Sequence, residues 1–215
     1  MDQPMSPEKF SDLIEAFSPE EQKEIRKYQH FPDQTRALMA YLAVKENLKE
    51  NASLFNAEIA KDERGRPFIK NWHGNISLSH SGNVALSGAA YNRIGADVQK
   101  RTAVPEAVAE LIFSGEEINL YRKLSADKKV HYLFVIWTLK EAYVKLQGTG
   151  FLEYDPASIT FILNERFTEV IEIRGAANRA LDFYLFEPVS GYQGAVCTEG
   201  VRSKKALQTS CSIME

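Results

Sequence analysis

Four polar side chains, at positions 97, 99, 141 and 145, are spaced so that they could act together. Asp97 and Gln99 lie two residues apart in a segment typical of a strand, so their side chains leave the same face. Glu141 and Lys145 lie four residues apart in a segment typical of a helix, so one stands above the other. This spacing allows each pair to face a single cleft.

The helix that carries Glu141 and Lys145 is otherwise apolar. An exposed ion pair at this spacing contributes only about 0.2–0.5 kcal/mol and is the simplest alternative. The surrounding apolar residues leave little of the helix free for solvent: Leu133, Phe134, Ile136, Trp137, Leu139 and Val144. Burying charges without partners costs free energy, so Lys140, Glu141 and Lys145 imply a counterion, a metal or a cleft.

Ser79 and His80 form a second polar group, and the residues alone leave its role open. A Ser, His80 and Asp97 triad is one hypothesis, but the G-x-S-x-G motif of serine hydrolases is absent. Strand-end serines that satisfy backbone groups are a simpler one. Alternatively His80 donates to a phosphate, with Arg36 and Arg66 supplying charge. The glycine-rich loops of the common phosphate-binding folds do not occur.

The pattern of apolar residues and capping signals divides the chain into alternating groups of helices and strands. Helices are predicted from Ser18, over 33–49, 105–113 and 127–147, and from Ser114, which forms a capping box with Glu117. Gly148 is placed to end the longest of them. Strands are predicted over 75–79, 84–90 and 94–98, as an antiparallel meander, and over 158–163, 169–173, 182–186 and 192–198.

This order predicts an α+β protein of two similar halves, residues 1–98 and 99–215, each an antiparallel sheet packed with helices. No residue-level repeat between the halves is evident, so the duplication is inferred from element order alone. The last fifteen or so residues show no clear period and are expected to fray.

Composition excludes several classes of protein. The net charge of −3 gives no general electrostatic reason to bind nucleic acid or an anionic membrane. No apolar stretch approaches the roughly 20 residues of a membrane span, and the N-terminal residues lack the pattern of a signal peptide. With only Cys197 and Cys211 there is little support for a disulfide scaffold. A soluble, cytoplasmic protein is expected.

Taken together, five segments resemble the 4′-phosphopantetheinyl transferase superfamily, particularly its surfactin-synthetase-activating (Sfp-like) type. They occur in the family's order and at about its spacing: GRP at 65–67, NISLSHSG at 75–82, IGADVQ at 94–99, FSGEE at 113–117 and WTLKEAYVKLQGTG at 137–150. One such motif would be weak evidence, whereas the ordered set is specific.

The resemblance implies a fold, a reaction and partners. It implies a pseudo-dimer of two α+β halves with coenzyme A and Mg²⁺ in the cleft between them. It implies transfer of 4′-phosphopantetheine from coenzyme A to a serine of an apo acyl or peptidyl carrier protein, with release of 3′,5′-ADP. A monomer is expected, because two halves in one chain supply what smaller relatives build from separate subunits.

The resemblance also implies residue roles. Asp97 and Glu141 would hold the magnesium ion, Glu141 would accept the proton of the carrier serine directly or through water, and Lys145 would contact the pyrophosphate. The other matched positions, assigned to coenzyme A, are Arg36 and His80 at the 3′-phosphate, Ser79 beside the phosphates and Arg66 near the adenine. Lys140 matches a family lysine, and its role is left open between ligand contact and helix packing.

Gln99 departs from the family pattern. Surfactin-type members carry a second acid there, whereas an amide oxygen coordinates Mg²⁺ without adding charge. The alternative function is therefore a non-catalytic coenzyme A or nucleotide-binding module of the same fold. Carrier domains are often acidic around the modified serine, which suggests Arg122, Lys123, Lys128 and Lys129 as docking residues.

Overall fold

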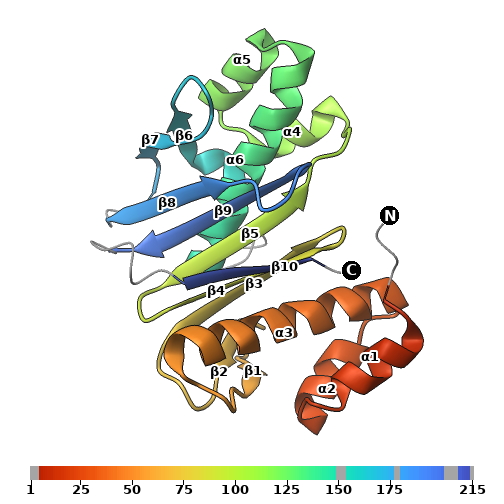
Figure 1. Ribbon diagram of the computed structural model, residues 1–215. Coiled ribbons are helices and arrows are strands. Elements are labelled where there is room, and N and C mark those ends of the chain that lie inside the picture. Colours follow the sequence, from red (N-terminus) through yellow and green to blue (C-terminus); the bar gives the residue numbers. More distant parts are fainter. Residues whose placement is uncertain (1–4, 149–153, 177–179, 201–207, 214–215) are drawn as a thin grey trace. The chain divides into compact units, whose positions relative to one another are not determined.

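The computed structural model describes residues 5–148, 154–176, 180–200 and 208–213, the last of these as backbone only. It divides into two compact units, one of residues 1–93 and 203–215 and the other of residues 94–202. Both are built from helices and small antiparallel sheets (Figure 1), which confirms the α+β prediction. Gly150, the last residue of the motif at 137–150, lies outside the described residues.

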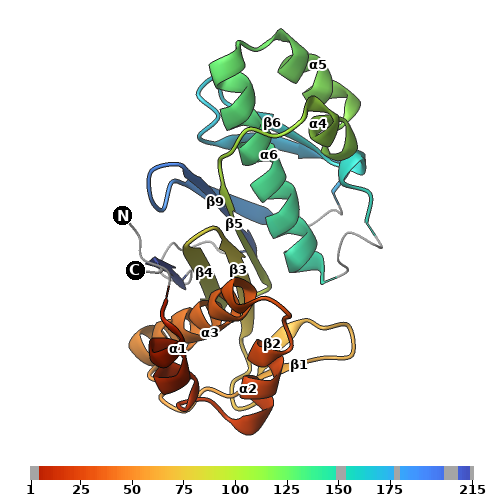
Figure 2. The same ribbon diagram turned by 90° about the vertical axis from the view of Figure 1, so that its right-hand side faces the viewer.

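The first unit holds three helices and two small sheets. The helices are α1 (Pro7–Ile14), α2 (Pro19–Arg26) and α3 (Phe31–Ala52), and the strands are β1 (Ile59–Lys61), β2 (Pro67–Ile69), β3 (Asn75–Ser81), β4 (Val84–Ala90) and β10 (Gln208–Ile213). Strands β1 and β2 form a hairpin, and β10, β4 and β3 form a three-stranded sheet in that order. Helix α3 packs on this sheet (Figure 2), and its residues Leu38, Tyr41, Val44 and Leu48 belong to the buried core of the unit.

The second unit repeats this inventory in a different chain order. It contains β5 (Ile94–Lys100), α4 (Glu106–Ile112), α5 (Gly115–Lys123), α6 (Ala126–Gln147), η1 (Pro156–Ser158), β6 (Thr160–Leu163), β7 (Val170–Arg174), β8 (Leu181–Phe186) and β9 (Tyr192–Glu199). Strands β6 and β7 form a hairpin, and β5, β9 and β8 form a three-stranded antiparallel sheet. Helix α6 lies across β5 and β9 (Figure 1).

The predicted helix signals are confirmed in detail. Ser18 with Glu21 and Ser114 with Glu117 both form complete capping boxes, at the starts of α2 and α5. Gly148 ends α6 with φ of 76°, a left-handed conformation that glycine adopts without a side-chain clash. The sequence prediction did not include α1, β1 or β2.

The predicted meander over 75–98 is wrong in its last strand. Strand β4 pairs with β3 and β10, whereas β5 pairs with β9 in the other unit. The division between units therefore lies at 93/94, while the expected boundary after residue 98 falls inside β5. The C-terminal segment was expected to fray, but residues 208–213 pair with β4 along their whole length.

Candidate active site

Strand β5 contacts helix α6 unusually closely. A Cβ atom added to Gly95 would lie 1.9 Å from the Ala142 carbonyl oxygen and 2.5 Å from the Leu146 backbone nitrogen. Only a residue without a side chain allows this approach. The contact sets β5 directly against the segment of α6 that carries Glu141 and Lys145.

Asp97 is the centre of the polar contacts between β5 and α6. Its side chain is buried, with 1% of the residue surface exposed. Lys145 Nζ donates to Asp97 Oδ1 at 2.6 Å and to the Ala96 carbonyl oxygen at 3.2 Å. Gln99 Nε2 donates to Asp97 Oδ2 at 3.1 Å, which confirms that residues 97 and 99 share a face of the strand. Lys145 thus pairs from helix to strand with Asp97.

Glu141 lies beside this group, and its protonation is strongly perturbed. Burial raises the pKa of Glu141 to about 7, and the negative charge of Asp97 adds to the increase. The charge of Lys145 and a hydrogen bond from Trp137 lower the pKa and oppose this shift. A carboxyl group with a pKa near neutrality is suited to accept and release a proton at physiological pH.

A hollow of about 280 Å³ opens beside Glu141. Its other lining residues are apolar: Leu111, Ile112, Trp137 and Pro156. Trp137 stacks against Phe134 with ring centroids 5.9 Å apart, so the indole is held on the helix surface that faces the hollow. The arrangement provides a polar end at Glu141 and apolar walls, as small-molecule sites commonly do.

The oxygen donors of this group suit a magnesium ion that also binds a substrate. Among the described residues there is no cluster of three or more His, Cys, Asp or Glu side chains able to hold a metal. Proteins commonly hold Mg²⁺ through one or two carboxylates together with substrate phosphates. Asp97 and Glu141 supply two carboxylates, and the Gln99 oxygen remains available because its nitrogen donates to Asp97.

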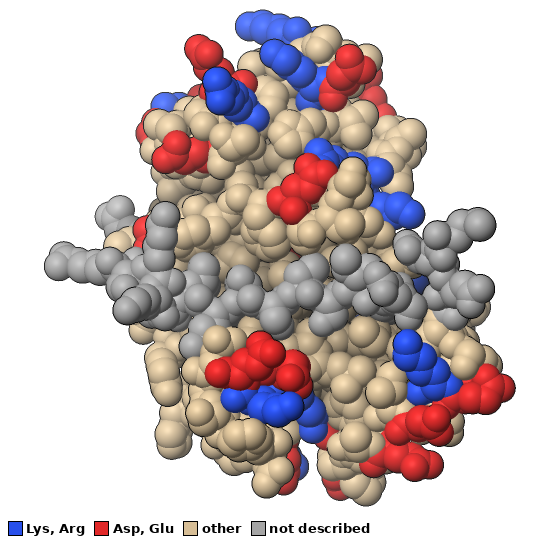
Figure 3. Space-filling view, viewed as in Figure 1, with Lys and Arg blue, Asp and Glu red and all other residues tan. Residues whose placement is uncertain are grey.

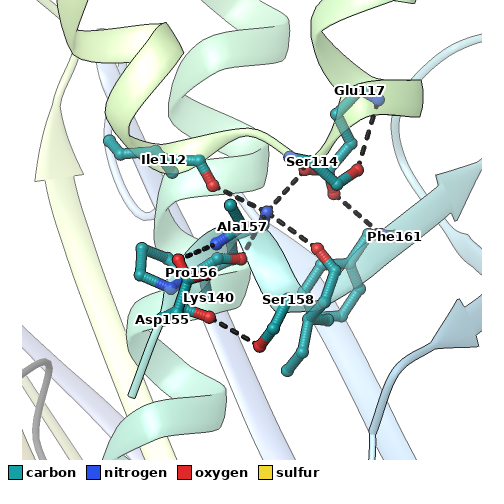
Figure 4. Close-up of polar contacts among 10 residues, drawn as sticks. Ile112, Ser114, Glu117, Lys140, Asp155, Pro156, Ala157, Ser158 and Phe161 are labelled. Atoms are coloured by element: carbon teal, nitrogen blue, oxygen red, sulfur yellow. Dashed lines mark hydrogen bonds and ion pairs between the residues drawn. The ribbon is translucent and has the colours of Figure 1, made fainter. Parts of the chain in front are cut away.

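Lys140 points away from this site and into the core. Its ammonium donates to a Glu117 carboxylate oxygen at 2.5 Å and to the carbonyl oxygens of Ile112, Pro156 and Ile159 (Figure 4). Only 1% of Lys140 is exposed. The sequence left the role of Lys140 open between ligand contact and helix packing. In the structure Lys140 packs in the core and makes buried hydrogen bonds.

In the first unit, the residues matched to coenzyme A occupy α3 and the sheet beneath it. Arg36 forms an ion pair with Asp33 and lines a hollow of about 80 Å³ together with Gly82 and Asn83, in the turn that follows β3. Strand alternation directs Ser79 and His80 to opposite faces of β3. This geometry does not suit Ser79 and His80 as a nucleophile and its base.

Arg66 is held at the start of β3. Its Nη2 donates to Asn75 Oδ1 at 3.3 Å, and its backbone nitrogen donates to Asp62 Oδ1 at 2.8 Å. Burial lowers the pKa of Arg66, and the charge of Arg93 lowers it further. The Asp62 carboxylate opposes this shift but has a smaller effect than Arg93, so the two guanidinium groups still favour an anion here.

The predicted docking cations lie among carboxylates. Arg122 pairs with Glu110 at 3.1 Å and Lys129 pairs with Glu106 at 3.3 Å. In Figure 3, basic and acidic side chains alternate on the end of the second unit that carries α4 and α5. Two of the four charges proposed for docking are therefore balanced within the unit itself.

Comparison with known proteins supports the resemblance found in the motifs. Residues 93–197 match the model of the 4′-phosphopantetheinyl transferase superfamily. That segment contains Asp97, Gln99, Glu141 and Lys145, so the match covers the whole group around Asp97. The class of protein that the chain resembles is thus this transferase superfamily.

The individual relatives narrow the resemblance to the Sfp-like type. The chain is 27% identical over 200 residues to the 4′-phosphopantetheinyl transferase ffp of Bacillus subtilis and 26% identical over 201 residues to Sfp of B. subtilis strain 168. Each match covers 92% of this chain and 88% of the relative. A holo-(acyl-carrier-protein) synthase of Bacillus anthracis, solved with coenzyme A (3′,5′-ADP), matches 49% of this chain and 93% of its own at 19% identity and a TM-score of 0.43.

Proposed function

We propose that this protein transfers the 4′-phosphopantetheine group of coenzyme A to a serine of an apo acyl or peptidyl carrier protein and releases 3′,5′-ADP. The observation that carries the proposal is the group formed by Asp97, Lys145 and Glu141, in which a lysine and two carboxylates meet at the contact of β5 with α6. Phosphoryl transfer needs positioning and charge neutralisation above all, and these side chains supply both.

The serine Oγ attacks the β-phosphorus of coenzyme A, and its proton passes to Glu141, whose pKa of about 7 suits a general base. The bond between that phosphorus and the bridging oxygen breaks, and 3′,5′-ADP leaves with the electron pair. Lys145 would offset the charge that develops on the pyrophosphate oxygens, and its ion pair with Asp97 beside Glu141 supports this role.

Asp97, Glu141 and the amide oxygen of Gln99 would hold Mg²⁺. When bound, the ion neutralises phosphate charge and polarises the phosphorus under attack. Asp97 keeps Lys145 in place through the 2.6 Å ion pair and orients Gln99 through its hydrogen bond. Among the described residues no third His, Cys, Asp or Glu joins Asp97 and Glu141, so metal affinity would depend on the phosphates of bound coenzyme A.

Residues of the first unit would bind the nucleotide part of coenzyme A. Arg36 and His80 are assigned to the 3′-phosphate, Ser79 to the neighbouring phosphates and Arg66 to the region of the adenine. The hollow beside Arg36 and the anion-favouring surroundings of Arg66 support these assignments. The ion pair of Arg36 with Asp33 must open or share its charge when a phosphate binds.

The protein is further expected to act as a cytoplasmic monomer. No helix in the described part of the chain is long and apolar enough to cross a membrane. A monomer is expected because this one chain contains two α+β units, which smaller members of the family build from separate subunits. A solution-scattering mass of a dimer or trimer would contradict the expected monomer.

The proposed function is tested by measuring the mass of the carrier protein before and after the reaction. Purified protein is incubated with coenzyme A, Mg²⁺ and a panel of apo carrier proteins, and 3′,5′-ADP is quantified in the same samples. A carrier that gains the mass of phosphopantetheine in step with 3′,5′-ADP release supports the transferase. If coenzyme A binds by calorimetry without Mg²⁺ dependence and no carrier changes mass, the non-catalytic binding module replaces it.

A further inference from the structure

Contrary to the expectation from the sequence, a residue-level repeat links the two units. The segment Phe17-Ser18-Pro19-Glu20-Glu21 precedes and begins α2, and the segment Phe113-Ser114-Gly115-Glu116-Glu117 precedes and begins α5. A Lys-Glu pair then occurs in each long helix, at 45–46 in α3 and at 140–141 in α6. Both helices contain 22 residues, and each lysine follows the first residue of its helix by the same number of positions.

The repeated residues make the same three-way junction in both units. Glu21 accepts hydrogen bonds from the backbone nitrogens of Ser18 and Ile59, each at 2.9 Å, and pairs with Lys45 at 3.0 Å. Glu117 accepts from Ser114 and Phe161, each at 2.8 Å, and pairs with Lys140 at 2.5 Å. Each glutamate therefore joins the start of a short helix, the first strand of a hairpin and a long helix.

The two lysines differ in what else they touch. Lys45 is 26% exposed in its side chain, and its ammonium lies 4.7 Å from the centre of the Phe17 ring. Lys140 is buried and also donates to the carbonyl oxygens of Ile112 at 2.8 Å and of Pro156 and Ile159 at 2.9 Å (Figure 4). The second junction thus holds two further backbone segments that the first does not.

Those backbone segments form walls of the hollow beside Glu141. Ile112 and Pro156 line it from the end of α4 and the start of η1, and Trp137 and Glu141 line it from α6. Successive residues on a helix point about 100° apart, so Lys140 enters the core while Glu141 faces the hollow. One buried ammonium therefore fixes both walls relative to the residue that follows it in sequence.

The hydrogen bonds of Lys140 also leave its ammonium no proton to donate to coenzyme A. An ammonium group has three protons, and four acceptors already surround that of Lys140. A buried ion pair is often no more stabilising than an apolar replacement of similar volume, so stability alone is weak ground for keeping it. What an apolar replacement could not supply is the set of directed bonds to Ile112 and Pro156.

On the basis of the proposed function, we propose that Lys140 and Glu117 are positioning residues for the transfer: their buried pair holds the walls of the hollow at the distance from Glu141 that the acceptor serine and the phosphopantetheine arm require. The pair acts through Glu141 and the hollow and does not touch either substrate. Lys45 and Glu21 are its structural counterpart in the first unit, where the neighbouring Glu46 is 57% exposed in its side chain.

The repeat provides a matched control for the test. Lys140→Met and Lys45→Met remove the same charge from equivalent junctions and keep a similar volume. In protein shown to be folded at the assay temperature by circular dichroism, Lys140→Met is expected to lower kcat by about 10- to 100-fold with KM for coenzyme A within twofold, the scale of a misplaced reacting group. Lys45→Met is expected to leave kcat and both KM values unchanged.

Two results would overturn the proposal. Equal loss of kcat in both variants would make the pair merely structural, and a raised KM for coenzyme A at unchanged kcat would make Lys140 a ligand. If Lys140→Met does not fold, Glu117→Gln is compared with Glu21→Gln by the same criteria, since glutamine still accepts one of the backbone hydrogen bonds. The charge-swapped double variant, Lys140→Glu with Glu117→Lys, should not restore activity, because the new carboxylate at position 140 would face three carbonyl oxygens.

A second measurement does not depend on turnover. In a Trp72→Phe background, Trp137 is the remaining tryptophan and reports on the hollow directly. Lys140→Met should shift its emission maximum and Lys45→Met should not, whether or not the parent modifies a carrier. An inactive parent would therefore overturn the proposed function, whereas unshifted Trp137 emission in Lys140→Met would overturn the positioning role.

Discussion

The two units use one scaffold but place different chemistry where the long helix meets the sheet. In the first, Asn47 of α3 contacts Ser87 of β4 at 3.5 Å, a contact between neutral groups. In the second, Lys145 of α6 pairs with Asp97 of β5 at 2.6 Å, beside a glutamate whose pKa is raised to about 7. Duplicated elements therefore need not share a function, and the charged copy is the one suited to catalysis.

The largest expected effect on the rate distinguishes the glutamates of the two Lys-Glu pairs, Glu141 and Glu46. Glu141→Gln should reduce carrier modification by about 10²- to 10⁴-fold, the contribution of a general base. Glu46→Gln changes the equivalent residue of α3, which is exposed and pairs with Lys49 at 3.3 Å, and should leave the rate unchanged. Rates are measured from carrier mass at saturating coenzyme A. Equal rates for Glu141→Gln and the parent would remove Glu141 from the mechanism.

A second prediction concerns the close contact that brings the charges together. Gly95→Ala places a Cβ 1.9 Å from the Ala142 carbonyl oxygen, so strand and helix must separate. We expect a loss of about 1–3 kcal/mol in the free energy of unfolding, typical of overpacking, together with reduced turnover. Gly115→Ala is the control, because a Cβ there meets no atom within 4 Å. Stability is measured by urea denaturation. If Gly95→Ala is as stable as the parent, β5 and α6 can separate without loss of stability and the prediction is wrong.

The raised pKa of Glu141 predicts that, in the absence of metal, this residue lowers the folding stability in a pH-dependent way. A carboxyl group with a pKa near 4.5 when unfolded and about 7 when folded binds more protons in the folded state, so stability falls as pH rises between these values. Glu141→Gln removes this penalty. Its melting temperature should match that of the parent near pH 4 and exceed it at pH 8.

Two controls sharpen that measurement. The equivalent Glu46→Gln substitution should not change the pH dependence of melting. Mg²⁺ with coenzyme A should reduce the difference between Glu141→Gln and the parent at pH 8, because bound cation offsets the repulsion between Asp97 and Glu141. A parent that melts at the same temperature as Glu141→Gln at every pH would contradict the assigned shift.

Much of this architecture was predictable because its signals are local. Capping boxes, the glycine after α6 and the alternation over 75–79 in β3 each depend on a few neighbouring residues, and the predicted bounds of β4 agree with the structure. The partner of β5 was not predictable in this way. Adjacent strands along a chain often pair, but β5 pairs with a strand almost a hundred residues away, which no local pattern encodes.

The site shows the same division between local and distant information. The spacing of Asp97 with Gln99, and the resemblance of the motifs to a known family, were enough to select the residues. The role of Lys140 depended on which way its side chain turns, and thus on the packing of α4, η1 and β6 around it. The repeat of Phe-Ser-x-Glu-Glu was present in the sequence, and comparing residues 17–21 with 113–117 would have revealed it.

The smallest expected effect exchanges the one residue that differs within this repeat. Pro19 occupies the first position of α2, and Gly115 occupies the first position of α5. The preceding serines have similar extended backbones, with ψ of 157° at Ser18 and 168° at Ser114, which a following proline requires. Gly115→Pro should therefore stabilise the protein by about 0.4–1 kcal/mol by restricting the unfolded chain, with turnover unchanged. Pro19→Gly should lower stability by a similar amount. If Gly115→Pro instead destabilises the fold, the two junctions differ in backbone despite sharing their hydrogen bonds, and the buried Lys140 pair could no longer be interpreted through its counterpart at Lys45.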